Sequence, residues 1–238
     1  MTALLLRLAG PLQSWGTGSR FTRRNTDRMP SRSGVIGLLA SATGRRRTDP
    51  LEDLLELRIG VRIDQPGKVE RDFQTARTRD GAESMPLSQR FYLADAVFAV
   101  AVEGDLALLE GLRAALRRPV YPLFLGRKSC PPAGKLDHGL RDGDVGEVLA
   151  AAEWLASRRV QERHGKPNAT LEVTRDCPLE TPGSDVVRDD PISFDQRHRQ
   201  YGWRSVIRYP VTIPNTLHNG VRNPPDPHDP MVLLEGLN

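Results

Sequence analysis

The pattern of hydrophobic and polar positions predicts a strand followed by a helix at the start of the chain. Residues 3–8 form a short apolar run that a Gly-Pro pair ends, as expected of a buried strand. Apolar side chains at positions 35, 36, 39 and 42 fall on one face of a helix. A serine before this segment supplies an N-cap and Gly44 a C-terminal stop, so the pattern predicts a helix over 34–44.

The pattern continues with alternating elements up to residue 118. Residues 51–57 suit one or two helical turns, and residues 58–64 alternate as a half-buried strand does. The run 91–102 is the most strand-like of the chain. Asp105 then caps a helix whose leucines, at 106, 109, 112 and 116, share one face until a proline ends it.

This order of elements predicts an α+β fold. The order strand, helix, strand, strand, helix matches the ferredoxin-like βαββαβ pattern except that a clear last strand is missing. Either Tyr121–Leu125 or Thr170–Thr174 supplies that strand. Residues 65–90 are polar and have no apolar periodicity, which predicts an irregular excursion or an extended hairpin that projects from the body.

The second part of the chain gives weaker signals. Residues 148–159 favour a helix, whereas 171–174 and 205–209 favour strands. The Pro-rich stretch 223–230 predicts a coil tail. We therefore expect two regions, residues 1–135 with the excursion and residues 136–238 with a smaller, β-rich part.

The positive charge is concentrated near the N-terminus. The chain holds 30 arginines but only four lysines, a bias that arises either from a GC-rich genome or from a surface that makes bidentate contacts with phosphates and bases. Position is more informative, because residues 1–50 carry nine arginines against two aspartates, a charge of +7, while the whole chain has +4. A basic segment on a nearly neutral body is typical of a protein that binds a polyanion.

Several kinds of chemistry lack their motifs. Cys130 and Cys177 form no Cys-x-x-Cys pair, and the five histidines show no metal-binding spacing, so we expect no metal site and no cofactor. Walker A, dinucleotide-binding and nucleophile-elbow motifs do not occur. The N-terminus does not resemble a signal peptide and no apolar run is long enough to span a membrane, which predicts a cytoplasmic protein.

Three segments have the composition of an RNA-binding surface, and each has an ordinary structural alternative. Residues 13–34 bring arginines and serines to a helix start, where anions bind readily; the alternative is a capped helix with a solvated loop. Residues 121–132 contain Gly-Arg-Lys-Ser before two prolines, which suits contact with a phosphodiester or a tight surface turn. Residues 71–79, with 89–92, interleave arginines and aromatics, as in single-stranded RNA binding or a charged hairpin with aromatic residues in the core.

Five motifs in these segments resemble one protein family. Gly10–Gly16, Pro30–Gly34, Arg71–Thr75, Arg90–Ala96 and Leu125–Pro131 are similar to the CasD family, the type I-E Cascade subunits that hold the 5′ handle of CRISPR RNA. The resemblance implies a RAMP-superfamily palm of ferredoxin-like (RRM-like) fold, a protruding thumb hairpin at 65–90 and a glycine-rich loop. It also implies partners: a CasC-type backbone subunit, a CasA-type large subunit and, through the assembled complex, target DNA.

The resemblance further implies an RNA-binding role for particular residues. Pro30, Ser31, Arg32 and Ser33 would meet phosphates of the handle, and Gly126, Arg127, Lys128 and Ser129 would grip its backbone. Family members usually have a histidine where this chain has Gln74, which leaves that position a hydrogen-bonding role. The remaining candidate RNA-binding residues are Ser14, Trp15, Arg20, Arg24, Arg28, Arg71, Thr75, Arg90 and Tyr92.

These residues favour RNA binding without catalysis. In the related type I-C branch the corresponding subunit cuts precursor RNA, and metal-free cleavage needs an acid and a base near the 2′-hydroxyl. Tyr92 with Lys128 is the only candidate pair in the palm motifs, since no histidine precedes His138. The alternative functions are a metal-independent endoribonuclease that processes precursor CRISPR RNA and, more weakly, a general single-strand binder.

Overall fold

A seven-stranded antiparallel sheet forms the centre of the molecule. The computed structural model describes residues 1–17, 23–195 and 197–218; Arg20 and the predicted tail at 223–230 lie outside the described residues. Across the sheet the strands are β10 (Asp185–Ser193), β11 (Gln200–Pro214), β9 (Asn168–Asp176), β4 (Arg58–Gln65), β7 (Val97–Glu103), β1 (Thr2–Ala9) and β8 (Asp137–Asp142).

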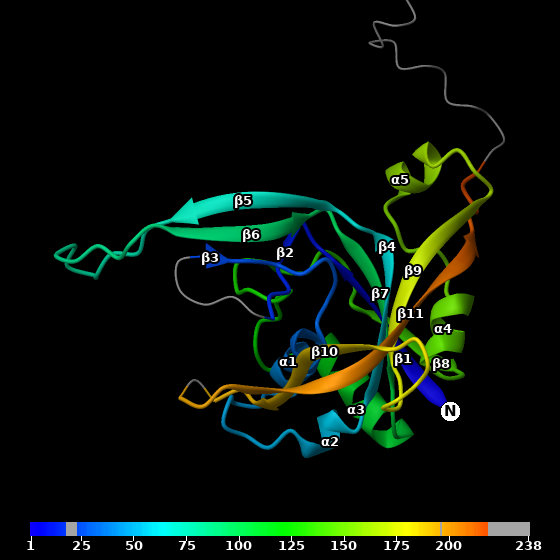
Figure 1. Cartoon of the computed structure of the whole chain (residues 1–238), viewed down its shortest axis with the longest axis horizontal. Coiled ribbons are helices and arrows are strands. Elements are labelled where there is room, and N and C mark those ends of the chain that lie inside the picture. Colours follow the sequence, from blue (N-terminus) through cyan, green and yellow to red (C-terminus); the bar gives the residue numbers. More distant parts are fainter. Residues whose placement is uncertain (18–22, 196, 219–238) are drawn as a thin grey trace, which may run out of the picture.

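Alternating side chains of the central strands build a core on each face of the sheet. On β1, Leu4, Leu6 and Leu8 pack into one core, and Leu5 points into the other. Helices α1 (Arg32–Ala42) and α3 (Leu106–Arg117) cover the first face and α4 (Val145–Ala151) the second (Figure 1). Within the described residues, no helix is both long and apolar enough to cross a membrane.

The strand, helix, strand, strand, helix, strand order is present in β1, α1, β4, β7, α3 and β8, with the short α2 (Glu52–Leu55) before β4. Both expectations for the last strand are wrong. That strand is β8, which pairs with β1, whereas 121–125 has no regular structure and 170–174 lies inside β9. Because β8 is an edge strand with only Gly139 fully buried, it carries no hydrophobic pattern.

The run 91–102 is two strands rather than the single strand expected. β6 (Ser88–Ala94) ends just before Asp95, whose positive φ of 55° turns the chain before β7 begins. β6 belongs to a second sheet, in which β5 (Lys68–Gln74) pairs along one edge and the short β2 (Leu12–Gln13) and β3 (Arg23–Arg24) pair along the other. The β5–β6 hairpin projects far from the main sheet (Figure 1), so 65–90 is the extended hairpin of the two alternatives.

The helix expected over 148–159 is confirmed only at its two ends, because a buried ion pair binds the backbone between them. Arg62 and Asp64 are fully buried and paired at 2.7 Å. Arg62 donates to the carbonyls of Ala152 and Glu153, and Asp64 accepts from the Leu155 N–H. The chain therefore leaves α4 at Ala151 and starts the separate α5 (Arg158–Arg163).

Strands expected at 171–174 and 205–209 are confirmed as parts of β9 and β11, while β10 has no counterpart among the predicted elements. β8 pairs with β1, and β9 pairs with β4. The main sheet therefore continues across residue 135, and the predicted division of the chain does not coincide with a boundary of the sheet.

Candidate nucleic-acid interface

The start of α1 is capped as the sequence predicts, and the cap uses the serine hydroxyls. Ser31 Oγ accepts from the backbone N–H of Gly34 at 3.1 Å. Ser33 Oγ lies 3.2 Å from Ser31 Oγ, and Pro30 and Ser31 are both buried. Of these three residues, only Ser33 reaches the surface in part.

Arg32 lies inside the protein, although the sequence places it among the phosphate contacts. Its guanidinium pairs with Asp176 at 2.8 Å and Asp190 at 2.7 Å, and it also donates to the carbonyl oxygens of Leu55 and Leu57. These four acceptors occupy both terminal nitrogens and Nε, and the residue is only 6% exposed. Arg32 thus joins α1 to β9 and β10, and its guanidinium is buried among these acceptors rather than at the surface.

Arg204 on β11 extends this ion-pair cluster. It pairs with Asp189 at 2.6 Å and with Asp176, and the backbone N–H of Arg32 donates to Asp189 at 2.7 Å. Burial alone lowers the pKa of Arg204, but hydrogen bonds and ion pairs with both aspartates raise it overall. The cluster of Arg32, Arg204, Asp176, Asp189 and Asp190 therefore fixes the β10–β11 hairpin against the start of α1.

The glycine-rich loop at 126–129 packs tightly on the segment after β2. Gly126 has a φ of +83°, and a Cβ added there would lie 1.7 Å from the Ser14 carbonyl oxygen. Arg127 donates to the carbonyls of Phe91 at 3.1 Å and Arg24 at 2.8 Å, and its guanidinium stacks 4.8 Å from the centre of the Tyr92 ring. Arg127 therefore cross-links three segments, whereas Lys128 and Ser129 beside it are exposed.

The three candidate segments meet at this point. β3 lies beside β6 with Arg24 opposite Arg90, and Arg23 stacks over the Phe91 ring at 5.3 Å. On the other edge of β6, β5 places Arg71 opposite Phe91. The exposed predicted residues around this junction are Arg24, Arg28, Arg71, Gln74, Thr75, Lys128 and Ser129.

Four other predicted residues lie in or near the core. Trp15 is buried against Gly34, and its indole N–H donates to Gln13 at 3.1 Å. Ser14 Oγ donates to the Phe91 carbonyl at 3.2 Å, and Tyr92 is buried under Arg127. Arg90 is half-buried, and its Nε has no hydrogen-bond partner among the described residues. Ser14, Trp15 and Tyr92 therefore support the surface from below.

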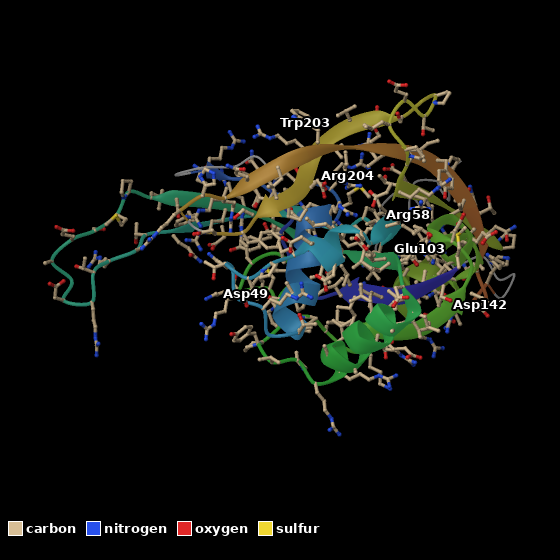
Figure 2. The ribbon with its side chains drawn as sticks, turned by 90° about the horizontal axis from the view of Figure 1, so that it is seen from below. Asp49, Arg58, Glu103, Asp142, Trp203 and Arg204 are labelled. Carbon is tan, nitrogen blue, oxygen red and sulfur yellow. The ribbon has the colours of Figure 1, made fainter. Side chains whose placement is uncertain are left out.

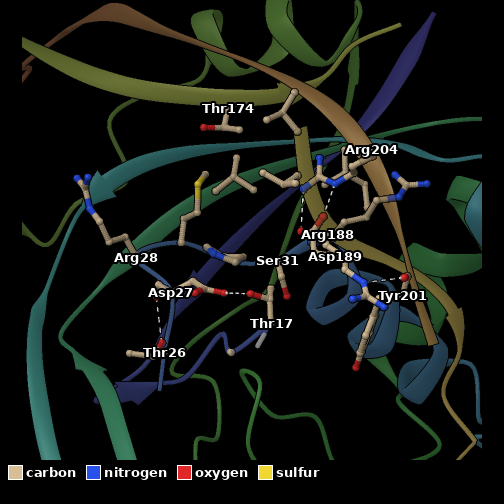
Figure 3. A pocket seen from close by; sticks show the side chains of 18 of the residues that line it. Thr17, Thr26, Asp27, Arg28, Ser31, Thr174, Arg188, Asp189, Tyr201 and Arg204 are labelled. Carbon is tan, nitrogen blue, oxygen red and sulfur yellow. Dashed lines mark hydrogen bonds and ion pairs between the residues drawn. The ribbon is translucent and has the colours of Figure 1, made fainter. Parts of the chain in front are cut away.

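The sequence did not reveal a cleft of about 1450 Å³ next to this surface (Figure 3). It lies between residues 26–32 and the β10–β11 hairpin, over strands β4 and β9. Arg188, Arg199, Tyr201, Arg204 and Arg208 line it from the hairpin. The Arg-Asp-Asp-Pro motif at 188–191 begins in this wall, but the pattern of its residues does not by itself indicate a cleft.

The β10–β11 hairpin presents different chemistry on its two faces. Figure 2 shows Trp203 and Arg204, consecutive on β11, on opposite sides of the hairpin. Arg204 faces the cluster at α1, whereas Trp203 is 65% exposed with the Arg188 guanidinium 5.9 Å from its ring. The inner face therefore forms a wall of the cleft, and the outer face is open.

One acid in the cleft is partly desolvated. Asp27 accepts a hydrogen bond from Thr17 Oγ1 at 2.7 Å. Burial raises the pKa of the Asp27 carboxyl, and the nearby Asp189 adds to this, while the bond from Thr17 opposes it. Within the described part of the chain, no three His, Cys, Asp or Glu side chains are grouped so that they could hold a metal ion.

Comparison with known proteins adds to this geometry. The sequence profile of the family described as CRISPR-associated protein (Cas_Cas5) matches residues 3–207. The chain belongs to the Cas5 family of CRISPR-associated proteins. The CRISPR system Cascade subunit CasD of Escherichia coli (strain K12) is 36% identical to this Cas5 family member over 148 residues. That alignment covers 54% of this chain and 66% of CasD, slightly less than two thirds of the relative's length.

Solved structures agree over more of the Cas5 chain. A chain of a CRISPR RNA-guided surveillance complex matches with a TM-score of 0.75 and 38% identity, covering 90% of this chain and 92% of its own. The crystal structure of a Cas protein matches with a TM-score of 0.68 and 35% identity, covering 94% of this chain and all of its own. The mixed α/β, sheet-rich fold is therefore shared with these proteins.

Proposed function

We propose that this Cas5 family member is a non-catalytic RNA-binding subunit of a type I-E Cascade complex, and that it holds the 5′ handle of the CRISPR RNA. In this proposal the β1–β8 unit is a ferredoxin-like RAMP palm, and the β5–β6 hairpin is its thumb. The resemblance to CasD and to a chain of a CRISPR RNA-guided surveillance complex supports this assignment.

One observation carries the proposal: three basic segments that are far apart in the sequence converge at one junction. Arg127 contacts the backbone of residues 24 and 25 as well as Phe91, so the glycine-rich loop, β3 and the return strand of the hairpin hold one another. Exposed Arg24, Arg71 and Lys128 surround this junction. Clustered cations beside a projecting hairpin suit the phosphates of a single strand.

The proposal is tested by the salt dependence of RNA binding. We expect the double variant Arg71→Ala/Lys128→Ala to bind a labelled handle RNA roughly tenfold more weakly. The slope of log K against log salt is expected to become shallower by about 1.4, because two fewer phosphate contacts mean that fewer counterions are released when the RNA binds. Fluorescence anisotropy of the full-length chain between low and physiological salt measures both quantities.

Arg159→Ala is the matched control, since Arg159 is an exposed arginine on α5 at a distance from the junction (Figure 1). We expect it to leave affinity and slope unchanged. A control loss about half that of the double variant on a logarithmic scale, since one charge is removed rather than two, would show that binding follows net charge alone, as in a general single-strand binder. An unchanged affinity of the double variant would overturn the placement of the RNA.

The proposed partners are a CasC-type backbone subunit and a CasA-type large subunit in the cytoplasm, with target DNA bound through the assembly. Co-expression with the other Cascade subunits and a repeat-containing RNA is expected to yield a stoichiometric complex that retains the RNA. Recovery of this chain without RNA or partners would contradict the proposal. A pure sample incubated with labelled repeat RNA in EDTA is expected to leave the RNA intact, and a discrete cut would favour the endoribonuclease instead.

The buried position of Tyr92 supports the binding role over cleavage. Its side chain is 4% exposed and one ring face carries the Arg127 guanidinium. A general acid or base has to come within hydrogen-bond reach of the reacting hydroxyl, and this arrangement keeps the Tyr92–Lys128 pair from doing so.

RNA affinity is expected to rise as the pH falls through the raised pKa of Asp27. Burial raises the pKa of this carboxyl, so it takes up a proton at a higher pH than an exposed aspartate does, and its repulsion of nearby phosphates then ends. Asp27→Asn is expected to bind about threefold more tightly at pH 7 and to remove the pH dependence. Anisotropy titrations at fixed ionic strength measure the effect; a variant that keeps the wild-type pH profile would assign the dependence to another group.

A further inference from the structure

The cleft next to the basic junction has an apolar floor and a basic rim. Ile59, Val61 and Val206 form part of its floor, and the rim carries Arg28 and Arg199, both exposed. In Figure 3, Arg28 lies on the side of the loop and Arg188 on the side of the hairpin. An apolar surface between cations fits a ligand with a flat, weakly polar part and an anionic part.

A polar group inside the cleft lacks a partner. Thr174 on β9 lines the cleft and is 6% exposed, and its Oγ1 has no hydrogen-bond partner among the described residues. Leaving a buried hydroxyl unpaired is unfavourable. Because rotation about χ1 moves the hydroxyl between staggered positions, a ligand in the cleft can supply the missing bond.

The charges around the cleft select the orientation of such a ligand. Asp189 is paired with Arg204, and Arg208 is paired with Asp185. Arg188 donates to the Tyr201 carbonyl at 3.2 Å and its guanidinium lies near Trp203 on the outer face, whereas the exposed Arg199 lines the cleft on the hairpin side. The acids Asp27 and Glu172 lie on the loop and on β9, so an anionic group is favoured near Arg199 on the hairpin side.

We infer that the cleft binds one nucleotide unit. Its base lies on the apolar floor with an edge hydrogen-bonded to Thr174, and its phosphate lies against Arg199. This inference rests on the proposed function, because the unit is either a nucleotide of the bound strand turned out of the path along β3 and β6, or a free nucleotide. The volume of about 1450 Å³ is sufficient for a base, its sugar and flanking phosphates.

The strand as the source is tested with abasic RNA. Each handle nucleotide is replaced in turn by an abasic residue, and binding is measured to wild type, Thr174→Val and Thr174→Ser. Valine has the shape of threonine without the hydroxyl, and serine keeps the hydroxyl. We expect one abasic position to weaken wild-type binding about tenfold and Thr174→Val to lose a similar factor, with no further loss when the two changes are combined. Thr174→Ser is expected to behave as wild type.

The phosphate end has a matched pair of variants. Arg199 lines the cleft, and Arg197 is exposed two residues away without lining it. We expect Arg199→Ala to weaken binding several-fold and Arg197→Ala to leave it unchanged. Equal effects of these two variants, or additive effects of Thr174→Val with every abasic position, would overturn the inference.

Calorimetric titration with AMP, GMP, CMP and UMP tests the free nucleotide as the source. Binding that Thr174→Val and Arg199→Ala weaken would support the cleft with a free ligand, even where wild type binds no handle RNA and the proposed function fails. Handle binding with no position coupled to Thr174, and no mononucleotide binding, would leave the proposed function standing and overturn the cleft assignment.

Discussion

Replacing Arg32 by alanine is expected to lower the free energy of unfolding by about 3–5 kcal/mol. The change leaves the Asp190 carboxylate without its partner and removes one cation from Asp176 in a cluster with little solvent. It also frees the carbonyl oxygens of Leu55 and Leu57, which accept at 2.7 Å. Urea unfolding followed by circular dichroism measures the loss as a shift of the midpoint.

Two further variants separate geometry from charge. Arg32→Lys keeps the charge but has one nitrogen where the guanidinium uses three, so we expect it to recover only part of the lost stability. Arg188→Ala removes an exposed arginine from the same hairpin and is expected to stay within about 0.5 kcal/mol of wild type. A loss below 1 kcal/mol for Arg32→Ala would contradict the structural role of this side chain.

The position of Arg32 shows what the sequence does not reveal. A serine cap, an arginine and a helix start are all local features, and they suit an anion site as well as a structural one. The partners that decide between the two, Asp176 and Asp190, lie 144 and 158 residues further along the chain. The local pattern predicted the cap correctly. It could not predict the partners of the arginine, because only the fold brings these acids to the helix.

The same reasoning separates the elements that were predicted from those that were not. Helix α3 was predictable because Asp105 caps it, accepting from the Leu108 N–H at 3.1 Å, and because its leucines repeat with the helical period. Edge strands β8 and β10 bury few side chains and have no such pattern. The split at Asp95 depends on which sheet each half of the run joins, and this is set by pairing with β1 and β5.

The composition of the three segments predicted the candidate surface, but packing decides which of their cations face solvent. Cations at the three segments did converge, since Arg24, Arg71 and Lys128 surround one junction. Within each motif, composition cannot distinguish an arginine that holds the protein together from one that faces solvent. Arg127 and Lys128 are neighbours in the sequence, yet the first bonds to three carbonyls and the second is exposed.

Gly126→Ala is expected to lower the free energy of unfolding by about 2–4 kcal/mol and to weaken RNA binding. The residue has a φ of +83°, which L side chains adopt at a cost, and its added Cβ would overlap the Ser14 carbonyl oxygen at 1.7 Å. Neither Gly126 nor Ser14 can shift by itself to remove this overlap. The Ser14 N–H donates to the Leu125 carbonyl at 3.1 Å, and the Leu125 N–H donates to the Cys130 carbonyl at 2.7 Å. The loop therefore has to move as a unit.

That movement links stability to the proposed function. Arg127 is the next residue, and its bonds to Arg24 and Phe91 hold β3 against β6. Gly111→Ala is the control, because Gly111 lies in α3 and a Cβ added there would meet open space. This change is expected to stabilise the protein by about 0.5–1 kcal/mol. Unfolding midpoints and handle affinities of both variants check the pair. A Gly126→Ala protein that unfolds like wild type would mean that Ser14 can yield to the new methyl group and that the loop is not held as the contacts indicate.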